Sequence, residues 1–145
     1  MSEGRVLAVD YGTRRMGLAV SDELGITAQG LATLVRRNRR SDLAALRTLA
    51  QQYEARRWVV GLPRLMSGDE GGMAAEVRAW GAGLERATGV VVEYWDERLT
   101  TREAGRVLQA AGASRSQAGR AVDKMAAVIL LQSYLDAGAI ARLPL

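Results

Sequence analysis

Residues 5–20 read RVLAVDYGTRRMGLAV, two short apolar runs joined by a polar turn. The first run, 5–10, ends on Asp10 and has the continuous apolar character of a buried strand. The second run, Leu18–Val20, follows Gly17, and two such runs joined by turn residues predict an antiparallel hairpin. The hairpin begins a β-sheet and puts an acidic residue at the end of its first strand.

The rest of the chain alternates helical patterns with apolar strands. In chain order, the expected elements are a strand within 26–34, a helix over 42–54 capped by Ser41, a strand around 58–60, a helix over 73–87 ending near Gly89, a strand over 90–94, a helix over 100–111 and a helix within 116–137. Strands separated by helices are parallel. The sequence therefore predicts one α/β domain, 1–145: a mixed five-stranded sheet, three antiparallel strands then two parallel, with helices on both faces.

The composition is that of a folded globular protein. Of the 145 residues, 48% are hydrophobic and 25% are charged, which is enough to bury one core. No apolar run approaches the roughly 18 residues that a membrane-spanning helix needs. The N-terminal segment lacks the long apolar stretch of a secretory signal. We therefore expect a cytoplasmic protein without membrane segments.

Cysteine and histidine, two residue types that often carry catalysis, are both absent from the sequence. Without cysteine, thiolate nucleophiles, zinc–thiolate centres and iron–sulfur clusters are excluded. Without histidine, the usual general base near neutral pH is excluded as well. Any catalysis must use carboxylates, hydroxyls, the single lysine, arginine, or a metal ion bound by oxygen ligands. Such ligands favour Mg²⁺ or Mn²⁺.

Three carboxylates occupy positions where a functional site is expected. Asp10 ends the first strand, Glu97 follows the last strand, and Asp123 lies near the start of the final helix. The carboxyl ends of parallel strands meet at one edge of a sheet, so Asp10 and Glu97 should project toward the same edge. Two alanines, Ala126 and Ala127, share the helix face of Asp123 and would let that helix approach the sheet closely. Three clustered carboxylates need a divalent cation to offset their repulsion.

Each carboxylate also has a purely structural interpretation. Asp10 before Tyr-Gly is ordinary turn chemistry, and Asp96–Arg98 fits a solvated charge cluster. Asp123 fits the cap of a helix that starts at Lys124. The turn DYGTRR, 10–15, has the Asp, Gly and hydroxyl that can hold a phosphate with its metal ion, but it also fits a plain hairpin. These patterns by themselves predict only an α/β domain with acidic residues at the ends of its strands.

Basic residues exceed acidic ones. Lysine and arginine total 20 against 16 acids, a net charge of +4, and Lys124 is the only lysine. Arginine suits bidentate contacts with phosphate, so the charge favours a nucleic-acid partner. Arginine-rich codon usage would produce the same bias, and most exposed charges are simply solvated. The basic residues nearest the three acids are predicted to bind nucleic acid: Arg14, Arg15, Arg98, Arg102, Arg120 and Lys124.

Four stretches, in order along the chain, resemble segments of the YqgF/RuvX family. They are LAVDYGTRRMGLAVSD (7–22), VVGLPRLMSGDEG (59–71), DERLTT (96–101) and AVDKMAAVILLQSYLD (121–136). The resemblance implies the ribonuclease H-like fold of Holliday-junction resolvases. It also implies a metal-dependent nuclease in which Asp10, Glu97 and Asp123 are the catalytic, metal-binding acids. Its implied role is processing of the 5′ end of the 16S rRNA precursor, with Holliday-junction cleavage for some members.

Other functions remain open at this point. A resolvase that cuts four-way DNA symmetrically would act as a homodimer, whereas RNA trimming would not require one. A non-catalytic RNA-binding assembly factor could keep the same fold. The Asp-Tyr-Gly-Thr turn is also similar to the first phosphate motif of actin-like kinases, but their nucleotide lies between two domains, and 145 residues supply one.

Overall fold

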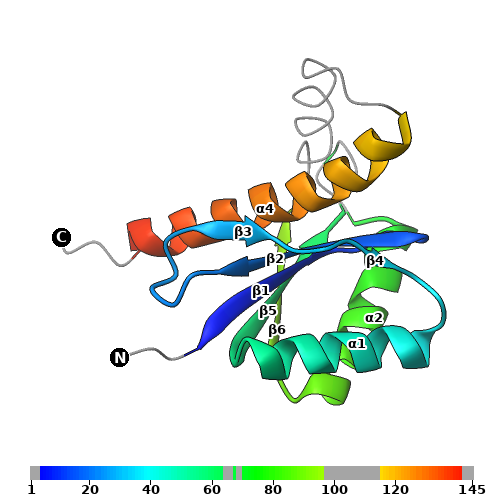
Figure 1. The fold of residues 1–145 in the computed structure, drawn as a ribbon, viewed down its shortest axis with the longest axis horizontal. Coiled ribbons are helices and arrows are strands. Elements are labelled where there is room, and N and C mark those ends of the chain that lie inside the picture. Colours follow the sequence, from blue (N-terminus) through cyan, green and yellow to red (C-terminus); the bar gives the residue numbers. More distant parts are fainter. Residues whose placement is uncertain (1–3, 64–66, 68–69, 97–114, 142–145) are drawn as a thin grey trace.

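The computed structural model describes residues 4–63, 67, 70–96 and 115–141, and in the last helix it describes the side chains of 121–138. A mixed sheet lies between α4 on one face and α1 with α2 on the other (Figure 1). The strands are β1 Arg5–Asp10, β2 Arg15–Ser21, β3 Ala28–Gly30, β4 Leu34–Val35, β5 Ala55–Leu62 and β6 Val92–Asp96. The helices are α1 Arg39–Gln52, α2 Gly72–Thr88 and α4 Arg115–Ala141.

The sheet confirms the predicted fold class, with one extra strand. Its order is β3-β2-β1-β5-β6, antiparallel on the β2 side of β1 and parallel from β1 through β5 to β6. The prediction of five strands was wrong because the segment expected to hold one strand forms two. Both β3 and β4 pair with β2, at opposite ends of that strand, which makes the sheet six-stranded.

The strands of the sheet centre are buried on both faces, as their unbroken apolar runs predicted. On one face, alternate residues of β1, β2 and β5 pack with α1 and α2; they include Leu7, Val9, Leu18, Trp58 and Val60. The intervening residues face α4 and form a second cluster with it: Val6, Ala8, Ala19, Val59, Ala127, Leu130, Leu131 and Leu135. Trp58 and Trp80 are both buried in the core.

Two predicted element boundaries move in the structure, and a third is confirmed. Helix α1 begins before Ser41, because Asn38 is the N-cap and its side chain accepts a 2.8 Å hydrogen bond from the Ser41 N–H. Helix α2 ends at Gly89 as predicted, with a left-handed φ of 71°. Strand β6 starts two residues later than predicted, because Val90 and Val91 lie between α2 and the sheet. The helix predicted over 100–111 lies outside the described residues.

Helix α4 is the longest described helix and packs along β2, β1 and β3. Among the described residues, no helix combines the length and the apolar character needed to cross a bilayer. The helix instead uses one apolar stripe, which includes Ala126, Ala127 and Leu130, to cover the sheet.

Candidate active site at the carboxyl edge of the sheet

Asp10 lies at the carboxyl end of the central strand β1. Side chains alternate across a strand, and Val6 and Ala8 both pack in the cluster that faces α4. Asp10 therefore belongs to the same face of the sheet. Its partner on β2 in the antiparallel register is Gly17, which is also on that face because Ala19 is.

Gly17 is a position where the backbone of α4 comes very close to the sheet. A Cβ built at Gly17 would lie 1.9 Å from the main-chain oxygen of Asp123 and 3.3 Å from the Cβ of Ala127. Only a glycine leaves room for the helix backbone at this distance. Asp10 is thus cross-strand neighbour to Gly17, and Asp123 lies directly over it. The fold brings these two predicted acids to one place on one face.

Asp123 lies inside α4, which begins at Arg115. The interpretation of Asp123 as the cap of a helix starting at Lys124 is therefore wrong. The predicted inward face is confirmed, since Ala126 and Ala127 are fully buried.

Arg15 contacts Asp123 in this structure. Its Nε donates a 2.7 Å hydrogen bond to Oδ2 of Asp123, a charge-assisted contact between residues 108 positions apart. The Arg15 side chain is 40% exposed and that of Asp123 is 22% exposed. The pair is therefore reachable by solvent, and its guanidinium already balances the carboxylate.

The other basic residues predicted to bind nucleic acid take different positions. The aliphatic part of Lys124 lies over β3, where a Cβ at Gly30 would be 2.5 Å from its Cγ, and the residue is exposed. Arg14 is exposed in the turn after β1, and its carbonyl accepts a 2.9 Å hydrogen bond from the Arg36 N–H. Arg14 belongs to the turn between β1 and β2, and Lys124 follows Asp123 in α4.

Several predicted site residues cannot be placed. Glu97, Arg98 and Arg102 lie outside the described residues, and of Arg120 only the backbone, in α4, is described. Asp96, which ends β6 opposite Leu62, is the last described residue before Glu97. Within the described residues no three acids stand close enough to hold a metal ion together, and Glu97 is not part of that search.

Arg36 holds the turn that follows Asp10, a role that the sequence did not predict. Arg36 donates from Nη1 to the carbonyl of Gly12 at 3.1 Å and from Nε to Asp42 at 3.4 Å, and its guanidinium lies over the Tyr11 ring. Burial alone would lower the pKa of Arg36, but Tyr11 and Asp42 raise it overall. No signal in the sequence separates Arg36 from its arginine neighbours, because its partners are brought to it only by the fold.

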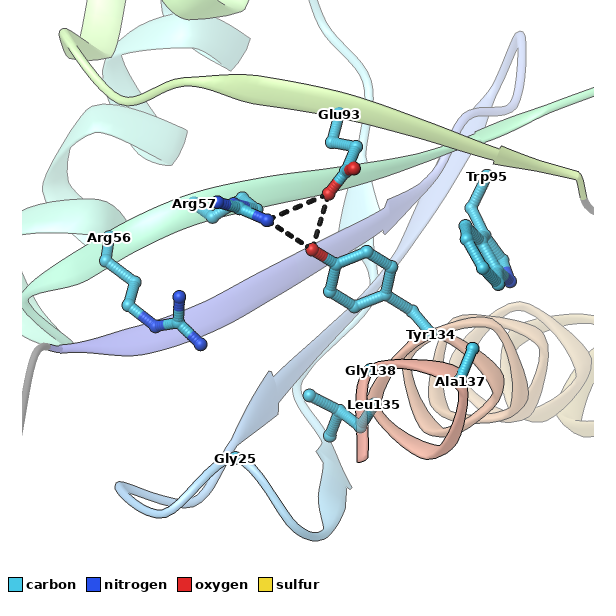
Figure 2. Close-up of a pocket in the computed structure, with 9 residues that line it drawn as sticks. All are labelled: Gly25, Arg56, Arg57, Glu93, Trp95, Tyr134, Leu135, Ala137 and Gly138. Carbon is cyan, nitrogen blue, oxygen red and sulfur yellow. Dashed lines mark hydrogen bonds and ion pairs between the residues drawn. The ribbon is translucent and has the colours of Figure 1, made fainter. Parts of the chain in front are cut away.

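A cavity of about 390 Å³ lies on the α4 face toward the amino ends of β5 and β6, away from Asp10 (Figure 2). In it Arg57 donates to Glu93 at 3.0 Å and to the Tyr134 hydroxyl at 2.6 Å, and that hydroxyl also contacts Glu93. Burial raises the pKa of the Tyr134 hydroxyl. Because its polar groups satisfy one another, we assign this network to the packing of α4 on the sheet.

A mixed sheet with a hairpin at its start, covered by α4, and with acids at its carboxyl edge defines the ribonuclease H-like class. Solved structures confirm it at the level of the fold. RuvC of Thermus thermophilus, in complex with a Holliday-junction substrate, matches with a TM-score of 0.55 and 16% identity over 94% of this chain and 96% of that one. The fowlpox virus resolvase, also in complex with Holliday-junction DNA, matches with a TM-score of 0.56 and 12% sequence identity. That match covers 92% of this chain and 97% of the resolvase chain.

The chain belongs to the RuvX family, which is described as Holliday junction resolvase. Residues 4–137 match the model of that family. It is similar to a protein of Koribacter versatilis named "Putative pre-16S rRNA nuclease", with 51% identity over 96% of this chain and 91% of the relative. A protein of the same name in Moorella thermoacetica is 48% identical, over 91% of this chain and 94% of the relative. The resemblance found in the sequence is thereby confirmed.

Proposed function

We propose that residues 1–145 form a single nuclease domain that hydrolyses phosphodiester bonds of structured nucleic acid with the help of Mg²⁺ or Mn²⁺. The proposed substrate is the 16S rRNA precursor, as the names of the relatives suggest. The proposed cut at its 5′ end is what the resemblance to the family implies, and the cytoplasm is the compartment expected from the sequence. The observation that carries the proposal is the contact of α4 with Gly17, which puts Asp10 and Asp123 on one face at the edge of the sheet.

The residues present fit a divalent cation. Carboxylate oxygens are ligands that Mg²⁺ and Mn²⁺ favour, and Asp10 and Asp123 supply them. The guanidinium of Arg15, 2.7 Å from Asp123, shows that this position stabilises a positive charge. Glu97 is proposed as the third ligand. The chemistry that such an ion supplies when bound is Lewis-acid activation of water and of the scissile phosphate.

The protein's own residues then have distinct roles. Asp10, on the central strand, fixes one side of the site through the rigidity of the sheet. Arg15 holds the Asp123 carboxylate, and its guanidinium would contact a phosphate oxygen of the substrate if a cation took over the charge of that carboxylate. Arg14 and Lys124, both exposed at the β2 side, are proposed to bind the substrate backbone and to offset charge that develops on the phosphate. Arg98, Arg102 and Arg120 are proposed for the same contacts.

The test is the Asp10→Asn variant, which keeps the shape of the side chain and removes its charge. Cleavage of a precursor 16S RNA fragment in Mn²⁺ should fall by at least about 10²-fold, the scale for loss of one group that stabilises a transition state. The matched control is Asp136→Asn, an exposed acid on α4 bonded to Gln132 at 2.9 Å. Full cleavage by Asp10→Asn, or cleavage unaffected by EDTA, would refute the proposal.

Holliday-junction cleavage is the second candidate, favoured by the match of the whole fold to a junction-bound resolvase. Assaying a synthetic four-way DNA junction beside the RNA fragment decides between them. A resolvase should also behave as a homodimer in size-exclusion chromatography, because two symmetric cuts need two sites. Tight RNA binding without cleavage of either substrate would instead indicate an assembly factor.

A further inference from the structure

A surface hollow of about 380 Å³ lies between β4 and α1, and it belongs to no part of the site described above. Its lining combines a cation, a hydroxyl, a buried carboxylate and apolar side chains: Leu34, Val35, Arg37, Ser41, Asp42 and Ala45. No pattern in the sequence separates Arg37 from the arginines beside it, so its place in a concave surface comes from the fold.

The hollow has a rigid floor. Asp42 is 2% exposed, and its carboxylate accepts hydrogen bonds from the Arg37 N–H at 3.1 Å and from Nε of Arg36 at 3.4 Å. Arg36 is in turn bonded to the carbonyl of Gly12 at 3.1 Å. The start of α1 is thereby tied to the turn that follows Asp10, so the backbone of Arg37 is held in a fixed position relative to that turn.

The side chain of Arg37 is available to a ligand. The residue is exposed, and among the described residues no ion pair of its guanidinium is found; Asp42 accepts a hydrogen bond from the Arg37 main chain instead. Its neighbour Arg39 turns elsewhere, with its guanidinium against Gly83 of α2. Ser41 is exposed next to Arg37, and Val35 is 58% exposed. A guanidinium and a hydroxyl beside an apolar wall match the phosphate and the sugar of a nucleic-acid backbone.

The hollow lies at the edge of the sheet on its α1 side, whereas Asp10 belongs to the face that α4 covers. Val35 pairs with Arg15 on β2, and Gly17, two residues farther along β2, pairs with Asp10. Two strand spacings and a two-residue offset put Val35 roughly 12 Å from Asp10. A strand that runs round the edge of the sheet at β4 would reach both places within a few nucleotides.

We propose that this hollow binds a backbone phosphate of the substrate, a few nucleotides from the scissile bond, with Arg37 as the phosphate ligand and Ser41 as a second donor. The proposal rests on the proposed function, since it takes nucleic acid as the substrate. Helix stability offers no other reason for the charge, because cations are unfavourable near the amino end of a helix. Arg37 positions the substrate and takes no part in bond cleavage.

The experiment compares Arg37→Gln with Arg47→Gln, which removes an equally exposed charge farther along α1. Binding of a fluorescein-labelled precursor 16S RNA fragment, and of a labelled four-way DNA junction, is measured by anisotropy in EDTA between 50 and 300 mM salt, a range chosen to bracket about 0.15 M. We expect Arg37→Gln to weaken binding about 5- to 10-fold at the middle of that range. One lost contact should also reduce the slope of log K against log salt by about 0.7–0.9. Arg47→Gln should match the wild type in both.

Cleavage separates this inference from the proposed function. Arg37→Gln should raise KM and leave kcat at saturating substrate unchanged. If Arg37→Gln and Arg47→Gln bind alike, the hollow is no phosphate site, whether or not the protein cleaves RNA. If the wild type cleaves neither nucleic acid but Arg37→Gln still weakens binding, the proposed nuclease activity is refuted and the proposed phosphate site in the hollow is supported. Equal melting temperatures of the two variants exclude a folding defect.

Discussion

Replacing Gly17 by alanine tests the contact that assembles the site. The new Cβ would lie 1.9 Å from the Asp123 main-chain oxygen, so α4 must move by about 1.5 Å to reach an ordinary contact of about 3.4 Å. Overpacking of this kind costs about 1–3 kcal/mol. For a chain of this size, the melting temperature should fall by roughly 3–10 °C.

The effect on catalysis should exceed the effect on stability. A misplacement of about 1 Å in a catalytic group can cost about 10²-fold in rate, and Gly17→Ala moves Asp123 away from Asp10 by more than that. The assay is cleavage of the RNA fragment in Mn²⁺, well below the melting temperature, so that loss of folded protein does not contribute.

The matched control is Gly72→Ala, because a Cβ at that position meets no atom within 4 Å. Gly72 begins α2, where alanine is favoured over glycine by up to about 1 kcal/mol. That variant should therefore melt no lower than the wild type and cleave at the same rate. If Gly17→Ala also keeps both its melting temperature and its cleavage rate, α4 does not depend on close approach at Gly17, and the reasoning for the site fails.

Three further outcomes are expected. Arg15→Gln should bind Mn²⁺ more tightly in a calorimetric titration, because the guanidinium no longer competes for Asp123, and an unchanged Mn²⁺ affinity would contradict this. The variant should lose only about 0.2–1 kcal/mol of stability, since the ion pair is partly exposed. Leu131→Ala, at a fully buried position against the sheet, should cost about 2–5 kcal/mol in denaturant unfolding, and a loss below 1 kcal/mol would be too small for that position. Hydrogen bonds from the main-chain N–H groups of Thr27 and Ile26 lower the pKa of Asp22 below its ordinary 3.8. The ionised Asp22 carboxylate therefore stabilises the folded state above pH 3.8, and this stabilisation is lost as the pH falls through the lowered pKa. Asp22→Asn should therefore be less stable at neutral pH and show a shallower loss below about pH 4 in acid unfolding.

Much of the architecture could be predicted from local patterns. The unbroken apolar runs predict strands buried on both faces, and the opening hairpin and the end of α2 at Gly89 follow from turn and cap chemistry. These features depend on residues close together in the chain, so a single sequence contains the information. The positions of Asp10 and Asp123 as candidates also follow from such patterns.

The convergence of the site was decided by tertiary structure. Nothing in the sequence shows that Gly17 receives the backbone of α4, or that Arg15 pairs with a carboxylate 108 positions away. Arg36 and Arg37 are adjacent arginines, yet one is held by Asp42 and Gly12 while the other faces a hollow. Sequence periodicity fixes which face of an element is apolar, whereas the distance between two elements depends on the side-chain volumes at their contact, and here that volume is the missing Cβ of one glycine.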